Sequence, residues 1–304
     1  MSAAFRPLAA APSAVEGLLA GAVARLAAAG VGTPRLDARL LLAHASKRNA
    51  DAFVLSPDRI TLNEAEIAAF HQLVGRRAGR MPLAYLTGHK EFWSLDLAVS
   101  EATLIPRPDS ETLIESGLAL LSGRQRQRLS VADIGCGSGA LLLAALSALP
   151  AATGVGCDCS EKAVDQAARN GRRLGPGKRA RFVRADWCRP ADAGWRQLVA
   201  GGPYDLVLCN PPYIPDADID GLAPEVAAFE PRVALAGGAD GLASYRRLAP
   251  LIGGLLAPGG HAVLELGGGQ AGAVAEIVTG AGLAVIGTSC DLASVERCIT
   301  VKIG

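Results

Sequence analysis

The chain has 304 residues, half of them apolar, and a formal net charge of +1 at pH 7. That length suits one large domain, or a main domain with a smaller companion. A charge this close to zero creates no strong field towards nucleic acid or a membrane surface, so composition argues against both as partners.

The alanine-rich N-terminus has some features of a signal or transit segment. However, Pro7, Pro12 and Glu16 break up the apolar core that a signal peptide needs, and Arg25 interrupts the next run. We therefore expect a first helix over residues 15–30. No uncharged apolar stretch is long enough to span a bilayer, and we expect a cytoplasmic protein.

Helical periodicity continues to about residue 80. A second helix is expected over residues 36–44, with Asp37 in its first turn. A third is expected from Thr61 to about Arg77, opened by the capping box Thr61-Leu62-Asn63-Glu64. The sequence thus predicts a small all-α domain over residues 1–80.

Residues 81–105 have the pattern of a linker that contains a strand or a β-hairpin, because Leu95, Leu97 and Val99 alternate with polar or small residues. The stiff segment Ile105-Pro106-Arg107-Pro108 follows. A helix is expected directly after it, with Asp109 in the first turn, where the helix dipole favours an acid.

From Leu129 onward, strand-like and helix-like stretches alternate. Strands are expected at 130–134, 154–157, 180–184, 205–209, 261–266, 283–287 and 297–301, and helices at 140–148, 161–174, 242–256 and 271–281. This alternation predicts an α/β domain over residues 106–304, with a doubly wound, mostly parallel seven-stranded sheet. No helix separates the last two strands, so the last one can insert antiparallel.

The cysteine pattern gives no metal site. No CxxC pair occurs, and the Cys-x-Cys at 157–159 lacks partners at zinc spacing. Several cysteines lie in apolar runs, where the thiol packs as a small hydrophobe, so we expect reduced core thiols. The seven are Cys136, Cys157, Cys159, Cys188, Cys209, Cys290 and Cys298.

A glycine-rich loop directly follows the first strand of the α/β region. It runs Gly135-Cys136-Gly137-Ser138-Gly139 and precedes an apolar helix, which lets a ligand approach the backbone closely. Alone it is a weak signal, because a packing turn has the same composition. The next strands end at Asp158 and at Asp186-Trp187, which suit a ribose and an adenine ring.

The fourth strand ends in Asn210-Pro211-Pro212-Tyr213. Each proline biases the residue before it towards extended backbone, and neither offers an N–H. The result is a stiff strand end with one amide, spare carbonyls and a ring. It suits a planar nitrogen group, whose hydrogens two acceptors would take. The competing interpretation is a rigid turn with Tyr213 in the core.

These strand ends together indicate a nucleoside cofactor. The G-x-G-x-x-G spacing of dinucleotide-binding folds is absent. The short glycine loop, the acids and Asn210–Tyr213 resemble S-adenosylmethionine-dependent methyltransferases instead. In that class, this tetrapeptide accompanies methylation of an adenine amino group or a glutamine amide.

Several stretches together resemble the release factor glutamine methyltransferases, the PrmC/HemK family. The resemblance covers nearly the whole chain, and the Ile105–Pro108 segment makes it specific. At Ala293-Ser294 the family would lead us to expect a glycine. The matching stretches are residues 36–41, 86–88, 91–95, 103–109, 133–139, 210–213, 229–232 and 237–242.

The resemblance implies N5-methylation of the glutamine in the Gly-Gly-Gln motif of peptide chain release factors, a step of translation termination. Asn210, Pro211 and Tyr213 would be catalytic, and with Pro212 they would hold the substrate glutamine. The domain over residues 1–80 would help to dock the release factor. S-adenosylmethionine would contact Gly135, Cys136, Gly137, Ser138, Gly139, Asp158, Trp187 and Asn210, to which strand position adds Asp186.

We expect release factors as partners, no direct DNA contact, no membrane and a monomer, with S-adenosylhomocysteine as product. Alternatives are a glutamine methyltransferase for a ribosomal protein and a DNA adenine N6-methyltransferase. Near-zero charge and the short gap between Tyr213 and His261 argue against the DNA enzyme. A nucleoside-binding regulator is the non-enzymatic alternative, and the intact Asn210 argues against it. Gly268-Gly269-Gln270 echoes the substrate motif, and we interpret it as a turn.

Overall fold

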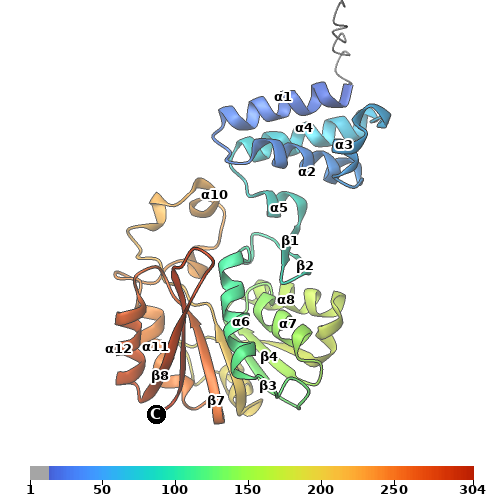
Figure 1. The fold of residues 1–304 in the computed structure, drawn as a ribbon. Coiled ribbons are helices and arrows are strands. Elements are labelled where there is room, and N and C mark those ends of the chain that lie inside the picture. The colour runs from blue at the N-terminus through green and yellow to red at the C-terminus, as the bar shows by residue number, and fades with distance from the viewer. Residues whose placement is uncertain (1–13) are drawn as a thin grey trace, which may run out of the picture. The chain divides into compact units, whose positions relative to one another are not determined.

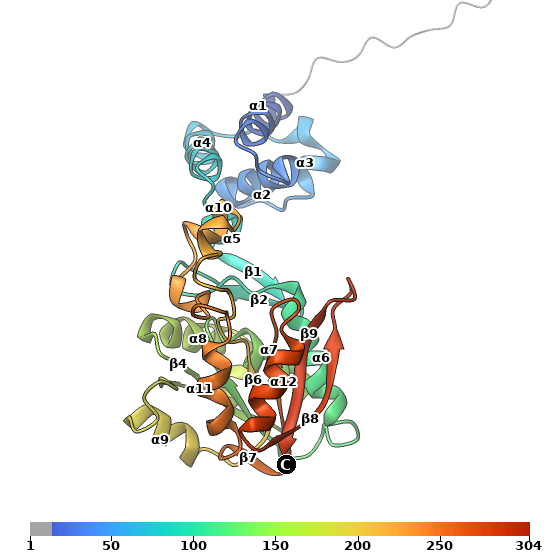
Figure 2. The same cartoon turned by 90° about the vertical axis from the view of Figure 1, so that its left-hand side faces the viewer.

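The computed structural model describes residues 14–304, in two compact units: one that ends at Thr87 and one that runs from Gly88 to Gly304. Figures 1 and 2 show the elements of each unit from two sides. The interpretation of Pro7 and Pro12 concerns residues outside the described range. Across residues 14–304, no helix combines the length and the apolar character needed to cross a membrane.

The first unit is helical, as predicted. Its core is built from fully buried side chains such as Leu26, Leu41 and Phe70. A buried ion pair joins Arg77 Nε and an Asp37 carboxylate oxygen at 2.7 Å. The elements are α1 (Ala14–Ala28), α2 (Pro34–Ser46), α3 (Ala52–Leu55), the 3₁₀ turn η1 (Pro57–Arg59), α4 (Glu64–Ala78) and α5 (Leu83–Thr87).

The predicted capping box is wrong by two residues. The first residue of the box is Asn63, whose side-chain oxygen accepts from the Glu66 N–H at 2.9 Å. The Glu66 carboxylate in turn accepts from the Asn63 N–H at 2.8 Å. Asn caps a helix as well as Thr does, and Glu66 stands at the required third position, so the sequence offers two overlapping boxes.

A seven-stranded sheet forms the second unit, in the order β5-β4-β3-β6-β7-β9-β8. β9 lies between β7 and β8 and is antiparallel to both, while the other pairings are parallel. The predicted mostly parallel sheet with an inserted last strand is confirmed. The strands are β3 (Ser130–Ile134), β4 (Thr153–Asp158), β5 (Ala180–Arg184), β6 (Tyr204–Cys209), β7 (Leu256–Glu265), β8 (Leu283–Cys290) and β9 (Glu296–Ile303).

The helices of this unit cover both faces of the sheet (Figure 1). The helix predicted over residues 242–256 ends at Ile252, because β7 begins at Leu256, and α9 was missed altogether. The longer helices are α6 (Glu111–Leu120), α7 (Ala140–Ala148), α8 (Glu161–Arg173), α9 (Ala193–Ala200), α11 (Ala243–Ile252) and α12 (Ala271–Gly280). The short ones are η2 (Pro108–Ser110), η3 (Gly175–Arg179), η4 (Ile219–Gly221), α10 (Pro224–Ala227) and η5 (Arg232–Ala234).

Alternate side chains of β6 enter two separate hydrophobic cores. Leu206 and Leu208 pack with residues of α6 and α7. Val207 and Cys209 pack with residues of α9, α11 and α12 on the other face. Because successive strand residues point to opposite faces, both cores hold β6 firmly, and its last residue is a rigid base for whatever follows.

The predicted hairpin is present, with β1 (His89–Phe92) paired antiparallel to β2 (Leu95–Ala98). Its two turn residues, Trp93 and Ser94, have φ values of 52° and 58°. Two positive φ angles in a two-residue loop match the twist of paired strands. Phe92 and Leu97 are buried with residues of α6 and α7, so the hairpin belongs to the core of the second unit.

Two predictions about surface residues need correction or explanation. Cys188 and Cys290 are exposed, so they are not core thiols, although all seven cysteines are unpaired. Ser294 has φ of 60°, in the left-handed region that favours glycine, and this explains why a glycine is expected there.

Candidate active site

The glycine loop and Asn210–Tyr213 meet because of the strand order. β3 and β6 are neighbours, and their last residues, Ile134 and Cys209, are register partners. The chain winds away from β3 in one direction and away from β6 in the other. Open α/β sheets bind ligands at such a switch point, beyond the carboxyl ends of the strands.

Three glycines of the loop have positive φ: Gly135 at 79°, Gly137 at 51° and Gly139 at 83°. A Cβ on Gly135 would lie 3.3 Å from the Trp187 ring, whereas one on Gly137 would meet nothing within 4 Å. Gly139 instead packs against α8, where a Cβ would lie 3.2 Å from that of Ala167. The loop is thus tightly packed beneath and open at Gly137.

A cavity of about 300 Å³ lies over this loop. Other predicted residues lie elsewhere: Gly139 lies beneath the loop, Pro211 is buried, and Asp186 accepts from the Cys188 N–H at 2.8 Å outside the cavity wall. Tyr213 lines an adjoining cavity of about 200 Å³, which also reaches Asn210. The predicted residues that line the larger cavity are Gly135, Cys136, Gly137, Ser138, Asp158, Trp187, Asn210 and Pro212.

Asp158 anchors the floor of the larger cavity. Its two carboxylate oxygens accept from the Gly137 N–H at 3.0 Å and the Ser160 N–H at 2.9 Å. Burial raises the pKa of Asp158, while these backbone N–H groups act in the opposite direction. Each oxygen keeps a lone pair for a further donor, as a ribose diol would require.

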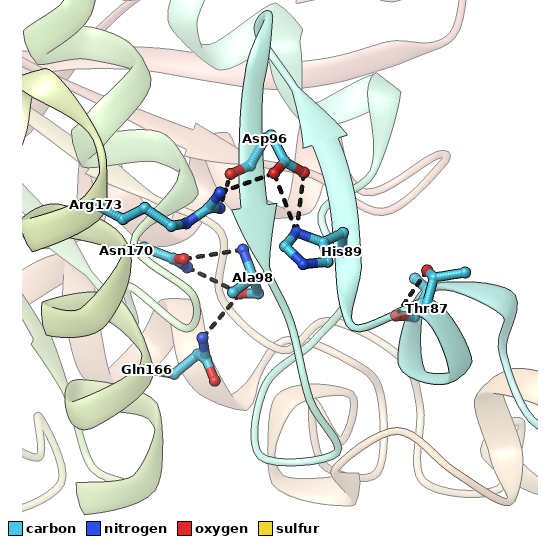
Figure 3. A network of polar contacts seen from close by, with 8 residues as sticks. Thr87, His89, Asp96, Ala98, Gln166, Asn170 and Arg173 are labelled. Carbon is cyan, nitrogen blue, oxygen red and sulfur yellow. Dashed lines mark hydrogen bonds and ion pairs between the residues drawn. The ribbon is translucent and has the colours of Figure 1, made fainter. Parts of the chain in front are cut away.

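Asn170 of α8 joins the glycine loop to strand β2, and Figure 3 shows its contacts with Ala98 of that strand. Its side chain is fully buried and donates to the carbonyls of Ala98 and Ser138, both at 2.9 Å. It also accepts from the Ala98 N–H at 2.9 Å. Gln166, one turn earlier, donates to the same Ala98 carbonyl at 3.0 Å. One helix face therefore ties strand β2 to the glycine loop.

Asn210 is held in one orientation. Its side-chain nitrogen donates to the Ser110 hydroxyl at 3.2 Å, and its side-chain oxygen has no hydrogen bond within residues 14–304. No backbone N–H in that range donates to the Pro211 carbonyl outside regular elements. The Asn210 oxygen, on a residue that lines both cavities, is therefore available to an incoming N–H₂ group, and the Pro211 carbonyl of the next residue is a second acceptor without such a bond.

Both the hydroxyl and the main-chain carbonyl of Tyr213 are hydrogen-bonded. Its hydroxyl donates to the Glu265 carboxyl at 3.3 Å, and its carbonyl accepts from the Gln270 side-chain nitrogen at 3.0 Å. Burial and the nearby Glu265 raise the pKa of Tyr213, so the phenol stays protonated. A Cβ on Gly241 would lie 2.4 Å from the Tyr213 carbonyl, so only glycine fits there.

Arg107 and Glu230 form an ion pair at the site. Glu230 is buried and accepts from Arg107 and from the Ile105 N–H, the latter at 3.1 Å. Arg107 lines both cavities. This pair joins the Ile-Pro-Arg-Pro segment to the segment at residues 229–232, two stretches that carry the family resemblance.

Sequence reasoning missed Ser110, Glu265 and Gln270. Glu265 had a detectable signal, because a carboxylate inside the apolar run at 261–266 has to find a partner once buried. Gln270 was noticed only as an echo of Gly-Gly-Gln, and the structure makes it part of a turn, as interpreted. Nothing local singled out Ser110, since its partner Asn210 is 100 residues away.

The cavity fits an adenosyl cofactor. It offers a glycine cradle open at Gly137, a carboxylate with spare lone pairs in Asp158, and the Trp187 ring on its wall. Among residues 14–304, no group of three or more His, Cys, Asp or Glu side chains could hold a metal ion.

The fold and this site define a Rossmann-like methyltransferase, and comparisons with known proteins agree. A methyltransferase domain model matches residues 131–229, and a PrmC N-terminal domain model matches residues 17–88. The solved hMettl16 catalytic domain has a TM-score of 0.53 at 14% identity, covering 76% of this chain and 82% of its own, which shows the fold alone.

Two curated relatives are both named release factor glutamine methyltransferase. The protein from Rhodospirillum rubrum is 45% identical over 91% of this chain and 82% of its own length. That from Bradyrhizobium diazoefficiens is 40% identical over 92% of this chain and 91% of its own. The chain belongs to the release factor glutamine methyltransferase family.

Proposed function

We propose that this protein transfers a methyl group from S-adenosylmethionine to the side-chain nitrogen N5 of the glutamine in the Gly-Gly-Gln motif of peptide chain release factors. The observation that supports this most directly is the state of Asn210. Its nitrogen is occupied by Ser110, and its oxygen is available beside a glycine-lined cavity. A primary amide offers two hydrogens to match the Asn210 oxygen and the Pro211 carbonyl.

The protein's part in the reaction is to orient a poor nucleophile. The lone pair of an amide nitrogen is delocalised into its carbonyl, so the nitrogen reacts only when well aligned. The Asn210 oxygen and the Pro211 carbonyl accept its hydrogens, and the Tyr213 ring flanks the amide plane. Both acceptors stabilise the positive character that the nitrogen gains, so rate comes from proximity and from aligned dipoles.

The bound cofactor supplies an electrophilic methyl group. The backbone around Gly135 and Gly137 would admit it closely, Asp158 would accept from its ribose hydroxyls, and Trp187 would pack beside its adenine. Asn210 borders this cavity as well as the neighbouring one, which brings the donor and the acceptor together. Asp186 lies outside the cavity wall, so we assign its carboxylate to the turn that precedes Cys188.

A substrate panel tests this function. Labelled S-adenosylmethionine is offered with a release factor, with the same factor carrying Ala in place of the motif glutamine, with ribosomal proteins and with duplex DNA. We expect label on the unaltered release factor alone. Label on the DNA alone, or on a ribosomal protein alone, would overturn the proposal in favour of one of the two alternative methyltransferases.

We further propose that the helical unit ending at Thr87 docks the release factor, and that the enzyme acts as a cytoplasmic monomer. The match of that unit to the PrmC N-terminal domain supports the first point, since this part is particular to the family rather than to methyltransferases in general.

A further inference from the structure

Glu265, the last residue of β7, is an unusual group to find beside this site. It is 2% exposed, and its neighbours along the strand are the fully buried Leu264 and Leu266. One carboxyl oxygen accepts from the Tyr213 hydroxyl at 3.3 Å, and the other has no hydrogen-bond partner within residues 14–304. A carboxyl group so little compensated costs stability.

The groups around Glu265 only partly offset the effect of burial on its carboxyl. Burial raises the pKa of Glu265 to about 7, although the Ser110 and Tyr213 hydroxyls and the Arg297 guanidinium act in the opposite direction. Arg297 is itself shared, since it also pairs with Asp109 at 3.2 Å and with Asp291 at 2.7 Å. A methionine at position 265 would satisfy the core better, so stability does not explain the carboxyl.

The Glu265 carboxyl contacts residues 210–213, which we call the acceptor motif. Its partner Tyr213 is the last residue of the motif, and its other polar neighbour, Ser110, is the group that holds the Asn210 nitrogen. The printed geometry therefore joins Glu265 to the motif through the Tyr213 hydroxyl.

A second contact holds the same motif by its backbone. The Gln270 side chain accepts from the Gly267 N–H and donates to the Tyr213 carbonyl, both at 3.0 Å. Its amide is therefore used on both sides. Gly267 and Gln270 lie two and five residues after Glu265, so the end of β7 and the turn after it contact both the hydroxyl and the main chain of Tyr213.

We propose that Glu265, supported by Gln270, is a positioning residue for the acceptor motif: Glu265 holds the Tyr213 hydroxyl and Gln270 the Tyr213 carbonyl, and together they set the orientation of the Tyr213 ring. This rests on the proposed function of Asn210 and Tyr213 and extends it to a residue that touches neither substrate nor cofactor. The unfavourable burial of the carboxyl is then a cost in stability that serves the geometry of the site.

The test compares Glu265→Met with Glu265→Gln in the full-length protein. Met removes both acceptors and keeps the volume, so we expect kcat for release factor methylation to fall about 10- to 100-fold, as for a misaligned nucleophile. The dissociation constant for S-adenosylmethionine stays unchanged, and thermal stability at pH 8 rises. Gln keeps an acceptor for Tyr213 and restores most of kcat.

A tyrosine pair supplies the matched control. Tyr213→Phe removes the hydroxyl that reaches Glu265, whereas Tyr204→Phe removes the hydroxyl of a fully buried tyrosine at the far end of β6, which donates to the Leu198 carbonyl at 2.6 Å. Tyr213→Phe should lower kcat, and Glu265→Met should add less in that background than in the wild type. Tyr204→Phe should lower stability and leave kcat unchanged.

An NMR measurement separates this proposal from the proposed function. The Tyr213 ring signals and the side-chain amide signals of Gln270 should shift or broaden in Glu265→Met and stay in place in Glu265→Gln, whichever substrate the enzyme methylates. Unmoved signals in Glu265→Met would overturn the positioning role, and so would a kcat that is unchanged in the folded variant. If no release factor is methylated by the wild type while the signals shift, the proposed function fails and the positioning role stands.

Discussion

The nitrogen and the oxygen of the Asn210 side chain have different roles. Ser110 takes the nitrogen, so the oxygen cannot rotate away from the cavity without breaking a hydrogen bond. An amide fixed in this way is a dipole aimed at one point, and a preorganised dipole needs no reorientation during the reaction. We propose this property, rather than acid–base chemistry, as the contribution of Asn210.

Asn210→Ala should therefore lower kcat by a factor of about 100 or more, the usual effect of losing one aimed dipole. Steady-state methylation of a release factor measures it. Asn210→Asp is the matched control: it keeps the size and an oxygen but loses the donor to Ser110, and it should also be strongly impaired. A turnover near that of the wild type in Asn210→Ala would refute the assigned role.

Two buried carboxyls should make stability depend on pH. Burial raises the pKa of Asp133 and of Glu265 to about 7, from ordinary values of 3.8 and 4.5. The folded state therefore holds these protons more tightly than the unfolded state does, and stability falls as pH rises from about 4 to about 7. We expect denaturation midpoints to fall over this range, with a shallower slope in Glu265→Gln. A slope in that variant equal to the wild-type slope would contradict the assignment to Glu265.

At the scale of elements, hydrophobic periodicity and the glycine, proline or polar residues at segment ends predict most of the helices and strands. The strands β3 and β5, and the helix α7, have the predicted bounds, because apolar runs end there at glycines or polar residues. The eight-residue α9 was missed because one turn of apolar spacing, Trp195 to Leu198, is too short to distinguish. Its signal was the cap: the Asp192 side chain accepts from the Trp195 N–H at 2.6 Å.

The part of the site that escaped prediction is the part made by contacts between distant segments. Composition and strand order placed Gly135, Asp158, Trp187 and Asn210 around one cavity. They did not place Asp186 correctly, because its carboxylate turns back to its own loop. Partners such as Ser110 depend on how helix α6 is set against β6, which no local pattern reveals.

The contacts of Asn170 with strand β2 and the glycine loop lead to a prediction about cofactor affinity and stability. Asn170→Leu leaves the Ser138 carbonyl and the Ala98 N–H without their side-chain partner, at about 1–3 kcal/mol for each buried group, while the Ala98 carbonyl keeps Gln166. The glycine loop should loosen, so affinity for S-adenosylmethionine should fall together with stability. Calorimetry of cofactor binding, with thermal denaturation, measures both.

Arg173, one turn further along the same helix face, is the control for that prediction (Figure 3). It pairs with Asp96 on β2 at 2.8 Å, but both side chains are well exposed. Exposed ion pairs contribute about 0–1 kcal/mol, so Arg173→Ala should leave cofactor affinity near the wild-type value. An equal loss of cofactor affinity in both variants would mean that any contact between α8 and the β1–β2 hairpin has this effect and that Asn170 has no special role.

At the scale of the whole molecule, the two units have separate cores, and we propose separate tasks for them. The helical unit is centred on residues such as Leu41 and Phe70, and none of its described residues, 14–87, lines the cavity. The sheet unit carries every residue assigned to the cofactor and to the acceptor amide. Binding of the protein substrate and chemistry on the glutamine should therefore be separable.

A fragment of residues 88–304 should bind S-adenosylmethionine with the affinity of the full protein. Its kcat/KM for a release factor should fall by at least about tenfold, since it lacks the proposed docking surface, and one lost contact region readily costs that much binding energy. Titration calorimetry and steady-state kinetics give the two values. Full kcat/KM in a well-folded fragment would rule out a docking role for the helical unit.

Tandem mass spectrometry of a release factor, after incubation with this enzyme and S-adenosylmethionine, is the most direct measurement. The predicted result is the mass of one added methyl group, placed by fragmentation on the side-chain amide of the Gly-Gly-Gln glutamine and absent with Asn210→Ala. A methyl group on another residue, or full methylation by Asn210→Ala, would contradict it.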